Sequence, residues 1–237
     1  MKIGILLSGC GVYDGAEIHE SVLSMLAVAN KGAEYQCLSI NQNQHHVINH
    51  LTGEEMKEER NMMVEAARIA RGDVKDIAEI ELDELDGLII PGGFGSAKNF
   101  TKWAFNGPDG EIMPELKLFL VNMYNIGKPI AALCVSPVVM AKALEGSAIL
   151  NMTLGSEKAP SPYEITGFHQ GLEKTGMNTE QKTNQEILID QKNKVITAPC
   201  YMMESTLPDI QNNIELAVEA LIKICLLYTS PSPRDQA

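Results

Sequence analysis

The sequence predicts an α/β fold in which a mostly parallel β-sheet carries helices on both faces. Short apolar runs alternate with helix-like segments along most of the 237 residues, which is typical of parallel strands joined by crossover helices. Hydrophobic residues make up 45% of the chain and charged residues 21%, the balance of an ordinary globular domain. A chain of this length buries enough surface to fold without disulfides or metals.

The first half of the chain opens with the apolar run KIGILL at residues 2–7, which is expected to be a buried strand. Apolar residues recur at helical spacing over 17–30 and 60–71, so both segments are expected to be helices. A strand is expected between them at 35–40. The next strand, at 87–90, ends at a Pro-Gly-Gly turn.

The second half is expected to continue this alternation and to close with a hairpin and a long helix. Its first helix begins at Pro114, where the missing N–H of proline is tolerated. The expected elements are a helix at 114–124, a strand at 129–133, a helix at 137–144, hairpin strands at 186–190 and 195–198, and a helix at 209–226.

We expect one domain, spanning residues 1–226, because no stretch rich in proline, glycine or serine divides the chain. The polar segment 42–57 is either an insertion near a site or a surface loop. Residues 227–237 are expected to be a disordered or artefactual tail, since Pro231 and Pro233 cannot continue a helix.

Charge and cysteine content restrict the partners and the compartment. The formal net charge is −12, which disfavours nucleic acid and anionic membrane surfaces. No apolar run reaches the ~20 residues of a membrane-spanning helix, and no targeting segment is recognised. The five cysteines are odd in number and form no CxxC pair. This pattern favours free thiols in a reducing compartment, so a cytoplasmic protein without a metal is expected.

The strongest chemical signal is PIAALCVSP, in which a buried strand delivers Cys134 to a turn and a helix follows at once. Sites in open parallel sheets lie at the carboxyl ends of strands. The positive end of the following helix is expected to lower the pKa of the thiol, and nearby N–H groups can receive an oxyanion. The alternative is a buried cysteine that only fills space. Cys10 and Cys200 also follow apolar strands but have no helix directly behind them.

Two further segments could contribute to the same edge of the sheet. The turn at Pro91-Gly92-Gly93 can bring N–H groups close to a ligand, although it matches neither a Walker loop nor a dinucleotide fingerprint. In the segment DGAEIHE, Glu20 is expected to cap the helix, whereas Glu17 could lean over the sheet edge and share a proton with the thiolate.

The histidines are weaker candidates for a functional role. His19 is expected to be a structural histidine, because it does not share a helix face with Glu17. His45, His46 and His50 lie in the polar segment at no fixed ligand spacing, so solvated side chains are expected there rather than a zinc site.

Six collinear segments resemble the ElbB family, the isoprenoid-biosynthesis glyoxalases of the class I glutamine amidotransferase-like and PfpI superfamily. The segments are LSGCGVYDGAEIHE, INHLTGE, EAARIARG, LDELDGLIIPGGFGSAKN, GKPIAALCVSP and NKVITAPCYM. The resemblance extends to about Leu226 and implies a flavodoxin-like three-layer sandwich. It also implies that the chain can form a homodimer, as several superfamily members do.

The resemblance assigns the nucleophile to Cys134, the proton-sharing carboxylate to Glu17 and the oxyanion hole to the N–H groups of Gly93 and Val135. It implies a glutathione-independent glyoxalase, a lyase that needs no cofactor and acts on a small reactive aldehyde. The expected reaction converts glyoxal to glycolate, with methylglyoxal to lactate as a further candidate.

The sequence departs from the wider superfamily because no histidine lies between Cys134 and His169, and His169 sits in a segment of weak resemblance. A cysteine without a partner histidine lacks the base that a hydrolase uses, so neither glutaminase nor peptidase activity is expected. The alternative function is a non-catalytic stress or accessory protein linked to isoprenoid metabolism, in which Cys134 senses oxidants.

Overall fold

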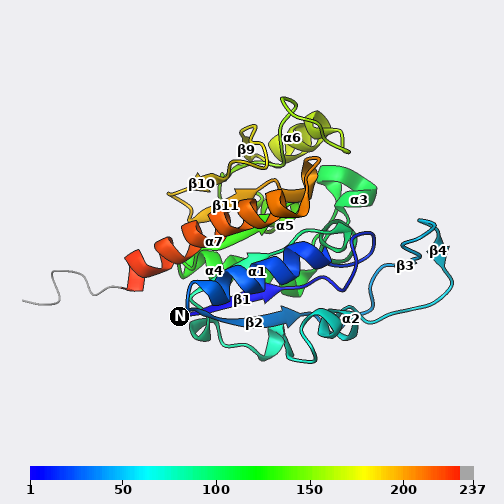
Figure 1. The fold of residues 1–237 in the computed structure, drawn as a ribbon, viewed down its shortest axis with the longest axis horizontal. Helices are drawn as coiled ribbons and strands as arrows, with labels where there is room; N and C mark the ends of the chain where they lie inside the picture. Colours follow the sequence, from blue (N-terminus) through cyan, green and yellow to red (C-terminus); the bar gives the residue numbers. More distant parts are fainter. Residues whose placement is uncertain (230–237) are drawn as a thin grey trace, which may run out of the picture.

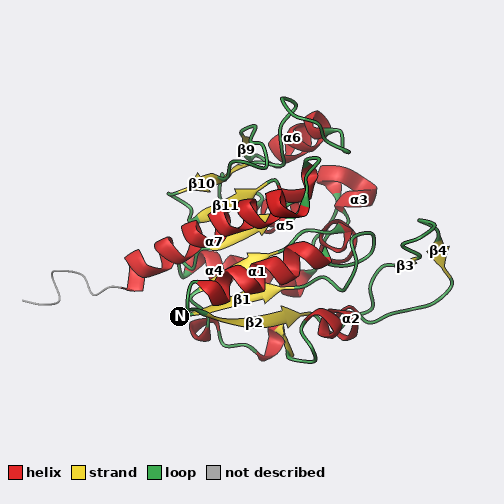
Figure 2. Ribbon diagram, in the orientation of Figure 1, coloured by secondary structure: helices red, strands yellow, loops and turns green. Residues whose placement is uncertain are grey.

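The computed structural model describes residues 1–229 and has a seven-stranded sheet at its centre (Figures 1 and 2). The strand order is β10 (Leu188–Asp190), β11 (Val195–Ala198), β7 (Ile130–Leu133), β6 (Gly87–Ile90), β1 (Lys2–Leu6), β2 (Glu34–Ser39) and β5 (Val74–Asp76). All neighbouring strands of this sheet are parallel except β10 and β11, which form an antiparallel hairpin. The predicted α/β fold of the flavodoxin-like type is confirmed.

Helices cover both faces of the sheet, as right-handed crossovers require. Helices α1 (Ile18–Asn30) and α7 (Leu207–Thr229) pack side by side on one face (Figure 2). Helices α4 (Pro114–Asn125) and α5 (Pro137–Leu144) pack together on the other. The short helix α2 (Met62–Ile69) packs near β2 and β5.

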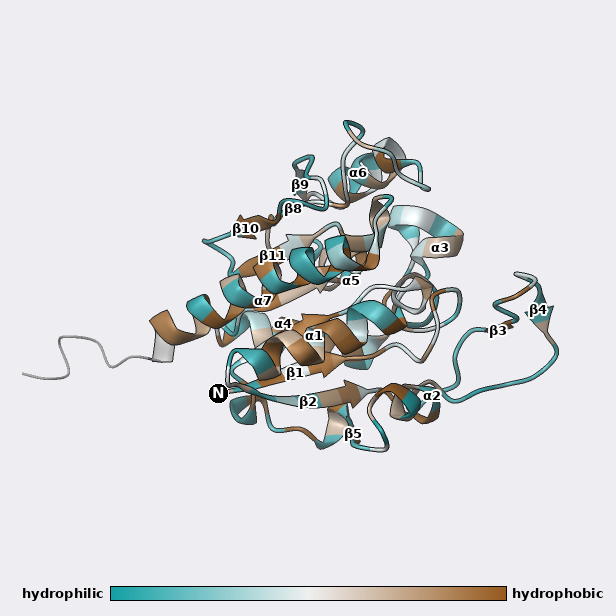
Figure 3. Cartoon of the chain, viewed as in Figure 1, coloured by the Kyte–Doolittle hydropathy of each residue, from teal (hydrophilic) through white to brown (hydrophobic). Residues whose placement is uncertain are grey.

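The core lies on both sides of the central strands. Figure 3 shows β1 as strongly hydrophobic, whereas the helices in front of it carry hydrophilic stretches. Ile3 and Ile5 of β1 and Leu88 and Ile89 of β6 are fully buried. Consecutive buried residues are typical of parallel strands sandwiched between helices.

Several elements were not predicted, and most of them span five residues or fewer, too short to show a periodicity in the sequence. The polar segment 42–57 forms a two-stranded ribbon that extends from the body of the molecule (Figure 1). The additional elements are the edge strand β5, the ribbon strands β3 (Val47–Ile48) and β4 (Glu55–Met56), a pair β8 (Asn151–Met152) and β9 (Asn178–Thr179), helices α3 (Trp103–Asn106) and α6 (Ile165–Lys174), a π-helical turn at Ser96–Phe100, and 3-10 turns at Ile77–Glu79, Leu82–Glu84, Gly107–Asp109 and Cys200–Met202.

The closing helix α7 continues to Thr229, so the first three residues of the expected tail are helical. The rest of that tail lies outside the described residues. Over residues 1–229, no helix combines the length and the hydropathy needed to cross a bilayer.

Candidate active site

Cys134 lies at the turn between β7 and α5, at the carboxyl edge of the sheet. Its φ angle is +55°, a left-handed conformation that is strained for a residue with a Cβ. The hydroxyl of Ser136 braces this turn by donating to the carbonyl of Pro91 at 2.7 Å. The N–H of Cys134 donates to the carbonyl of Ala198 on β11 at 2.9 Å. The predicted turn between strand and helix is therefore confirmed, and its backbone is strained at Cys134.

Two backbone N–H groups converge on the sulfur of Cys134. They belong to Gly93 and Val135, and both hydrogen-bond Sγ. Gly93 has a φ of +92°, and a Cβ at this position would overlap the backbone of Gly15 and Glu17. Only glycine therefore lets the turn after β6 present its N–H to the sulfur. These are the two groups expected to form the oxyanion hole, and their action on a substrate oxygen stays a prediction.

The carboxyl group beside the thiol belongs to Glu20, not to Glu17 as expected from the sequence. Glu20 is fully buried, and its side chain hydrogen-bonds that of Cys134. Its Oε2 accepts the N–H of Gly92 at 2.8 Å, and its Oε1 accepts the N–H of Tyr201 at 3.3 Å. These two backbone donors hold the carboxyl against the sulfur.

Glu17 has the capping role that was expected of Glu20. Helix α1 begins at Ile18, one residue later than predicted, so Glu17 is the N-cap and its Oε2 accepts the N–H of Glu20 at 2.7 Å. Glu20 lies one turn inside the helix, where side chains lean back toward the N-terminus, and this lean carries its carboxyl to Cys134. The signal available in the sequence was the spacing itself, since a capping residue followed three positions later by glutamate marks a helix start.

Burial controls the protonation of the Glu20 and Cys134 pair. Desolvation raises the pKa of the Cys134 thiol well above its ordinary value, and the neighbouring Glu20 raises it further. Desolvation, together with Glu17, raises the pKa of Glu20 to about 8. The expected lowering of the thiol pKa is therefore wrong, because the two amide hydrogen bonds lower it by less than burial raises it. Near neutral pH the pair carries at most one negative charge, since two charges so close in a poorly screened site repel strongly.

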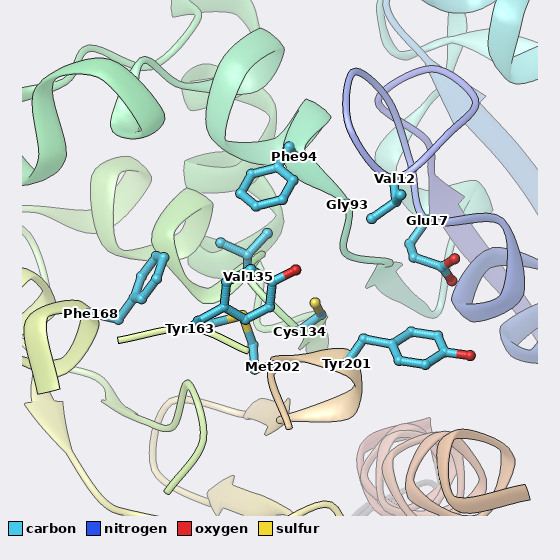
Figure 4. A pocket seen from close by; sticks show the side chains of 10 residues that line it. All are labelled: Val12, Glu17, Gly93, Phe94, Cys134, Val135, Tyr163, Phe168, Tyr201 and Met202. Atoms are coloured by element: carbon cyan, nitrogen blue, oxygen red, sulfur yellow. The ribbon is translucent and has the colours of Figure 1, made fainter. Parts of the chain in front are cut away.

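A small pocket opens over Cys134, and the carboxyl in its lining is that of Glu17, whereas Glu20 lies buried behind the thiol (Figure 4). The centre of a water molecule can move within only about 20 Å³ of it, roughly the space of one water. The pocket therefore suits a ligand of few heavy atoms. Its lining residues are Val12, Glu17, Gly93, Phe94, Cys134, Val135, Tyr163, Phe168, Tyr201 and Met202.

A second cysteine lies next to the first. Cys200 follows β11, has a φ of +45° and is fully buried. Its sulfur lies close to the N–H of Cys134, which donates to the carbonyl of Ala198. Cys10, the other cysteine that follows an apolar strand, interacts instead with Glu65 and Arg68 of α2.

No histidine within residues 1–229 hydrogen-bonds Cys134. Nδ1 of His19 pairs with the hydroxyl of Tyr201 at 2.9 Å, which fits the structural role expected of this histidine. His169 is buried and its Nε2 accepts the N–H of Leu154 at 3.3 Å. The described part of the chain also contains no group of three or more side chains arranged to bind a metal ion.

Comparisons with known proteins give the chain clear relatives, although no family model matches it. The human "Glutamine amidotransferase-like class 1 domain-containing protein 3, mitochondrial" is 37% identical over 225 residues, which cover 94% of this chain and 83% of that protein. A solved structure from Ehrlichia chaffeensis, described as an isoprenoid biosynthesis protein with an amidotransferase-like domain, is 33% identical. It has a TM-score of 0.86 and covers 94% of this chain and 99% of its own.

A more distant structure shares the fold only. Glyoxalase III from Candida albicans is 14% identical, with a TM-score of 0.56, over 93% of this chain and 97% of its own.

The expected cytoplasmic location is contradicted, because three curated relatives are named mitochondrial proteins.

Proposed function

This chain belongs to the ElbB family of class I glutamine amidotransferase-like proteins, and we propose that it is a cofactor-independent glyoxalase that converts glyoxal to glycolate. The observation that carries the proposal is the thiol of Cys134, which contacts the buried carboxyl of Glu20 and two backbone N–H groups beneath a small pocket. Glu20 replaces Glu17 in this proposal as the carboxyl that shares the thiol proton.

The first proposed step is addition of the Cys134 sulfur to one aldehyde carbon of glyoxal. A carbon–sulfur bond forms, and the electron pair of the carbonyl moves to its oxygen, which the N–H groups of Gly93 and Val135 stabilise. The proton shared by Cys134 and Glu20 passes to that oxygen. The products of this step are a hemithioacetal and a Glu20 carboxylate.

The second proposed step is an internal proton transfer. The Glu20 carboxylate takes the hydrogen from the carbon bonded to sulfur and returns it to the second carbon, while the hydroxyl proton moves to the second oxygen. The first carbon becomes the carbonyl of a thioester and the second becomes CH₂OH. Water then hydrolyses the thioester and releases glycolate, one proton and the free thiol. The sum is glyoxal plus water giving glycolate plus a proton.

The pocket supports a substrate of this size. Glyoxal has four heavy atoms and needs little space beyond the sulfur, and methylglyoxal adds one methyl group. A large peptide or nucleotide does not fit a cavity in which a water centre moves within about 20 Å³. The narrow site therefore favours small dicarbonyl compounds.

The test is glycolate formation from glyoxal without glutathione or added metal. Wild-type protein is expected to produce glycolate, and Cys134→Ala is expected to produce none while keeping its circular dichroism and melting temperature. Cys37→Ala is the matched control, because Cys37 is a buried thiol on β2 whose sulfur faces Met25 at 3.5 Å. Turnover in Cys134→Ala equal to the wild-type rate, or none in the wild type, contradicts the proposal.

A second candidate function is oxidant sensing, which the contact between Cys200 and Cys134 supports. A hydroperoxide would oxidise the Cys134 thiol to sulfenic acid and leave as an alcohol or water. The Cys200 thiol would then displace water to form a disulfide. Intact mass after mild peroxide treatment tests this, since the wild type should lose two hydrogens and Cys200→Ala should instead gain oxygen. An unchanged wild-type mass excludes the sensing function.

A further inference from the structure

Two tyrosines that the proposed reaction does not use line the pocket, and Tyr163 is the one whose hydroxyl faces the thiol. This residue lies between β8 and α6, in a segment distant in sequence from Glu20, Gly93 and Val135. Its ring packs edge-on against Phe94, with 5.9 Å between ring centroids and an interplanar angle of 74°. Figure 4 shows its hydroxyl pointing into the pocket toward Cys134.

The segment that carries Tyr163 is tied to the structure around the thiol. The hydroxyl of Ser161 donates to the carbonyl of Met202 at 2.6 Å and accepts the N–H of Tyr163 at 2.9 Å. The N–H of Glu204 donates to the carbonyl of Pro160 at 2.9 Å. The phenol is therefore held at a fixed position beside the residues that follow β11, which also orient Glu20 through the N–H of Tyr201.

The phenol is available to a ligand as a neutral donor. Burial, with the nearby Cys134 and Glu20, raises the pKa of Tyr163 to about 12, so the hydroxyl keeps its proton at neutral pH. Among the described residues, none forms a hydrogen bond with this hydroxyl. A half-buried O–H that faces a pocket without a protein partner can bond a substrate oxygen with little rearrangement.

We propose that Tyr163 selects 1,2-dicarbonyl substrates by donating a hydrogen bond to the carbonyl oxygen that is not attacked by Cys134. This inference rests on the proposed function, because it assigns the far end of the same substrate. When one oxygen lies against the N–H groups of Gly93 and Val135, the second oxygen of a dicarbonyl extends away from the sulfur toward the phenol. A simple aldehyde has no atom at that place. The same hydrogen bond stabilises negative charge on the second oxygen during the proton transfer between the carbons.

The test measures the adduct at Cys134 directly and does not depend on turnover. Hemithioacetal formation is followed by NMR with ¹³C-labelled glyoxal and with ¹³C-labelled acetaldehyde. Tyr163→Phe is expected to weaken the glyoxal adduct by roughly three- to tenfold, the value of one neutral hydrogen bond, and to leave the acetaldehyde adduct unchanged. The ratio of the two affinities is the readout, because a merely structural defect lowers both.

Tyr201→Phe is the matched control for loss of a phenol from the same pocket. Its hydroxyl bonds His19 and points away from Cys134 in Figure 4, so the glyoxal-to-acetaldehyde ratio should not change. An unchanged ratio in Tyr163→Phe, or an equal change in Tyr201→Phe, overturns the assignment. A changed ratio without any glycolate in the wild type supports the role of Tyr163 and rejects the glyoxalase proposal.

Discussion

The buried carboxyl of Glu20 hydrogen-bonds the thiol of Cys134, although the two residues come from different elements, the first turn of α1 and the end of β7. Burial raises the pKa of both groups, so near neutral pH the pair keeps at least one proton. This proton can pass to a substrate oxygen as the sulfur attacks. The pair then never carries two negative charges at once.

The first prediction compares the two glutamates. Glu20→Gln should lower kcat/KM for glyoxal by about 10²–10⁴-fold, the usual value of a proton-transferring group. Glu17→Gln should stay within about tenfold of the wild type, because a glutamine oxygen can still accept the N–H of residue 20 at the helix cap. Steady-state kinetics on glyoxal measure both. A larger loss in Glu17→Gln than in Glu20→Gln would restore the role expected from the sequence.

The second prediction concerns stability against pH. The pKa of Glu20 is raised to about 8 in the folded protein, against an ordinary value near 4.5. The folded state therefore binds this proton more tightly than the unfolded state does. The resulting contribution to the free energy of unfolding is complete below about pH 4.5 and is lost as the pH rises toward 8. Glu20→Gln removes this titration. The free energy of unfolding of the wild type minus that of Glu20→Gln should fall by a few kcal/mol over this range. Denaturant unfolding at several pH values measures it, and parallel pH profiles would refute it.

The third prediction concerns Gly92, which leaves room for the pair. A Cβ at this position would overlap the Cβ of Cys134 and lie 2.6 Å from Oε2 of Glu20. Gly92→Ala should lower the free energy of unfolding by roughly 1–3 kcal/mol and should strongly reduce glycolate formation. Gly53→Ala is the control, because Gly53 has a φ of +75° but no atom within 4 Å of an added Cβ. It should lose some stability and keep its activity, whereas equal activity in both variants would contradict the packing argument.

The fourth prediction is an absence of nitrogen chemistry. Release of ammonia or an amine requires a base that later protonates the leaving nitrogen, and within residues 1–229 no histidine hydrogen-bonds Cys134. Glutamine and peptide substrates should therefore give no ammonia or cleavage above the level of Cys134→Ala. Ammonia release from glutamine that disappears in that variant would show that another group acts as the base.

Local sequence was sufficient for the parts of the site that are contiguous along the chain. The apolar strand, Cys134 and the following proline-initiated helix lie within residues 129–144, so their strand-to-helix turn could be recognised without tertiary information. The same is true of the Pro-Gly-Gly turn after β6. The central parallel strands and the long helices were predicted for the same reason, because each strand is a continuous apolar run and each helix has apolar residues at helical spacing.

Tertiary structure decided which side chains meet the thiol. The choice between Glu17 and Glu20 depended on a helix start one residue later than its apolar pattern suggested, and capping contacts set such boundaries more than periodicity does. Cys200 and Tyr163 follow strands that are distant in the sequence from Cys134, and only the packing of the segments after β8 and β11 brings them to one edge. The raised pKa values follow from burial of the whole cluster, because desolvation depends on all the atoms that exclude water and not on the neighbours along the chain.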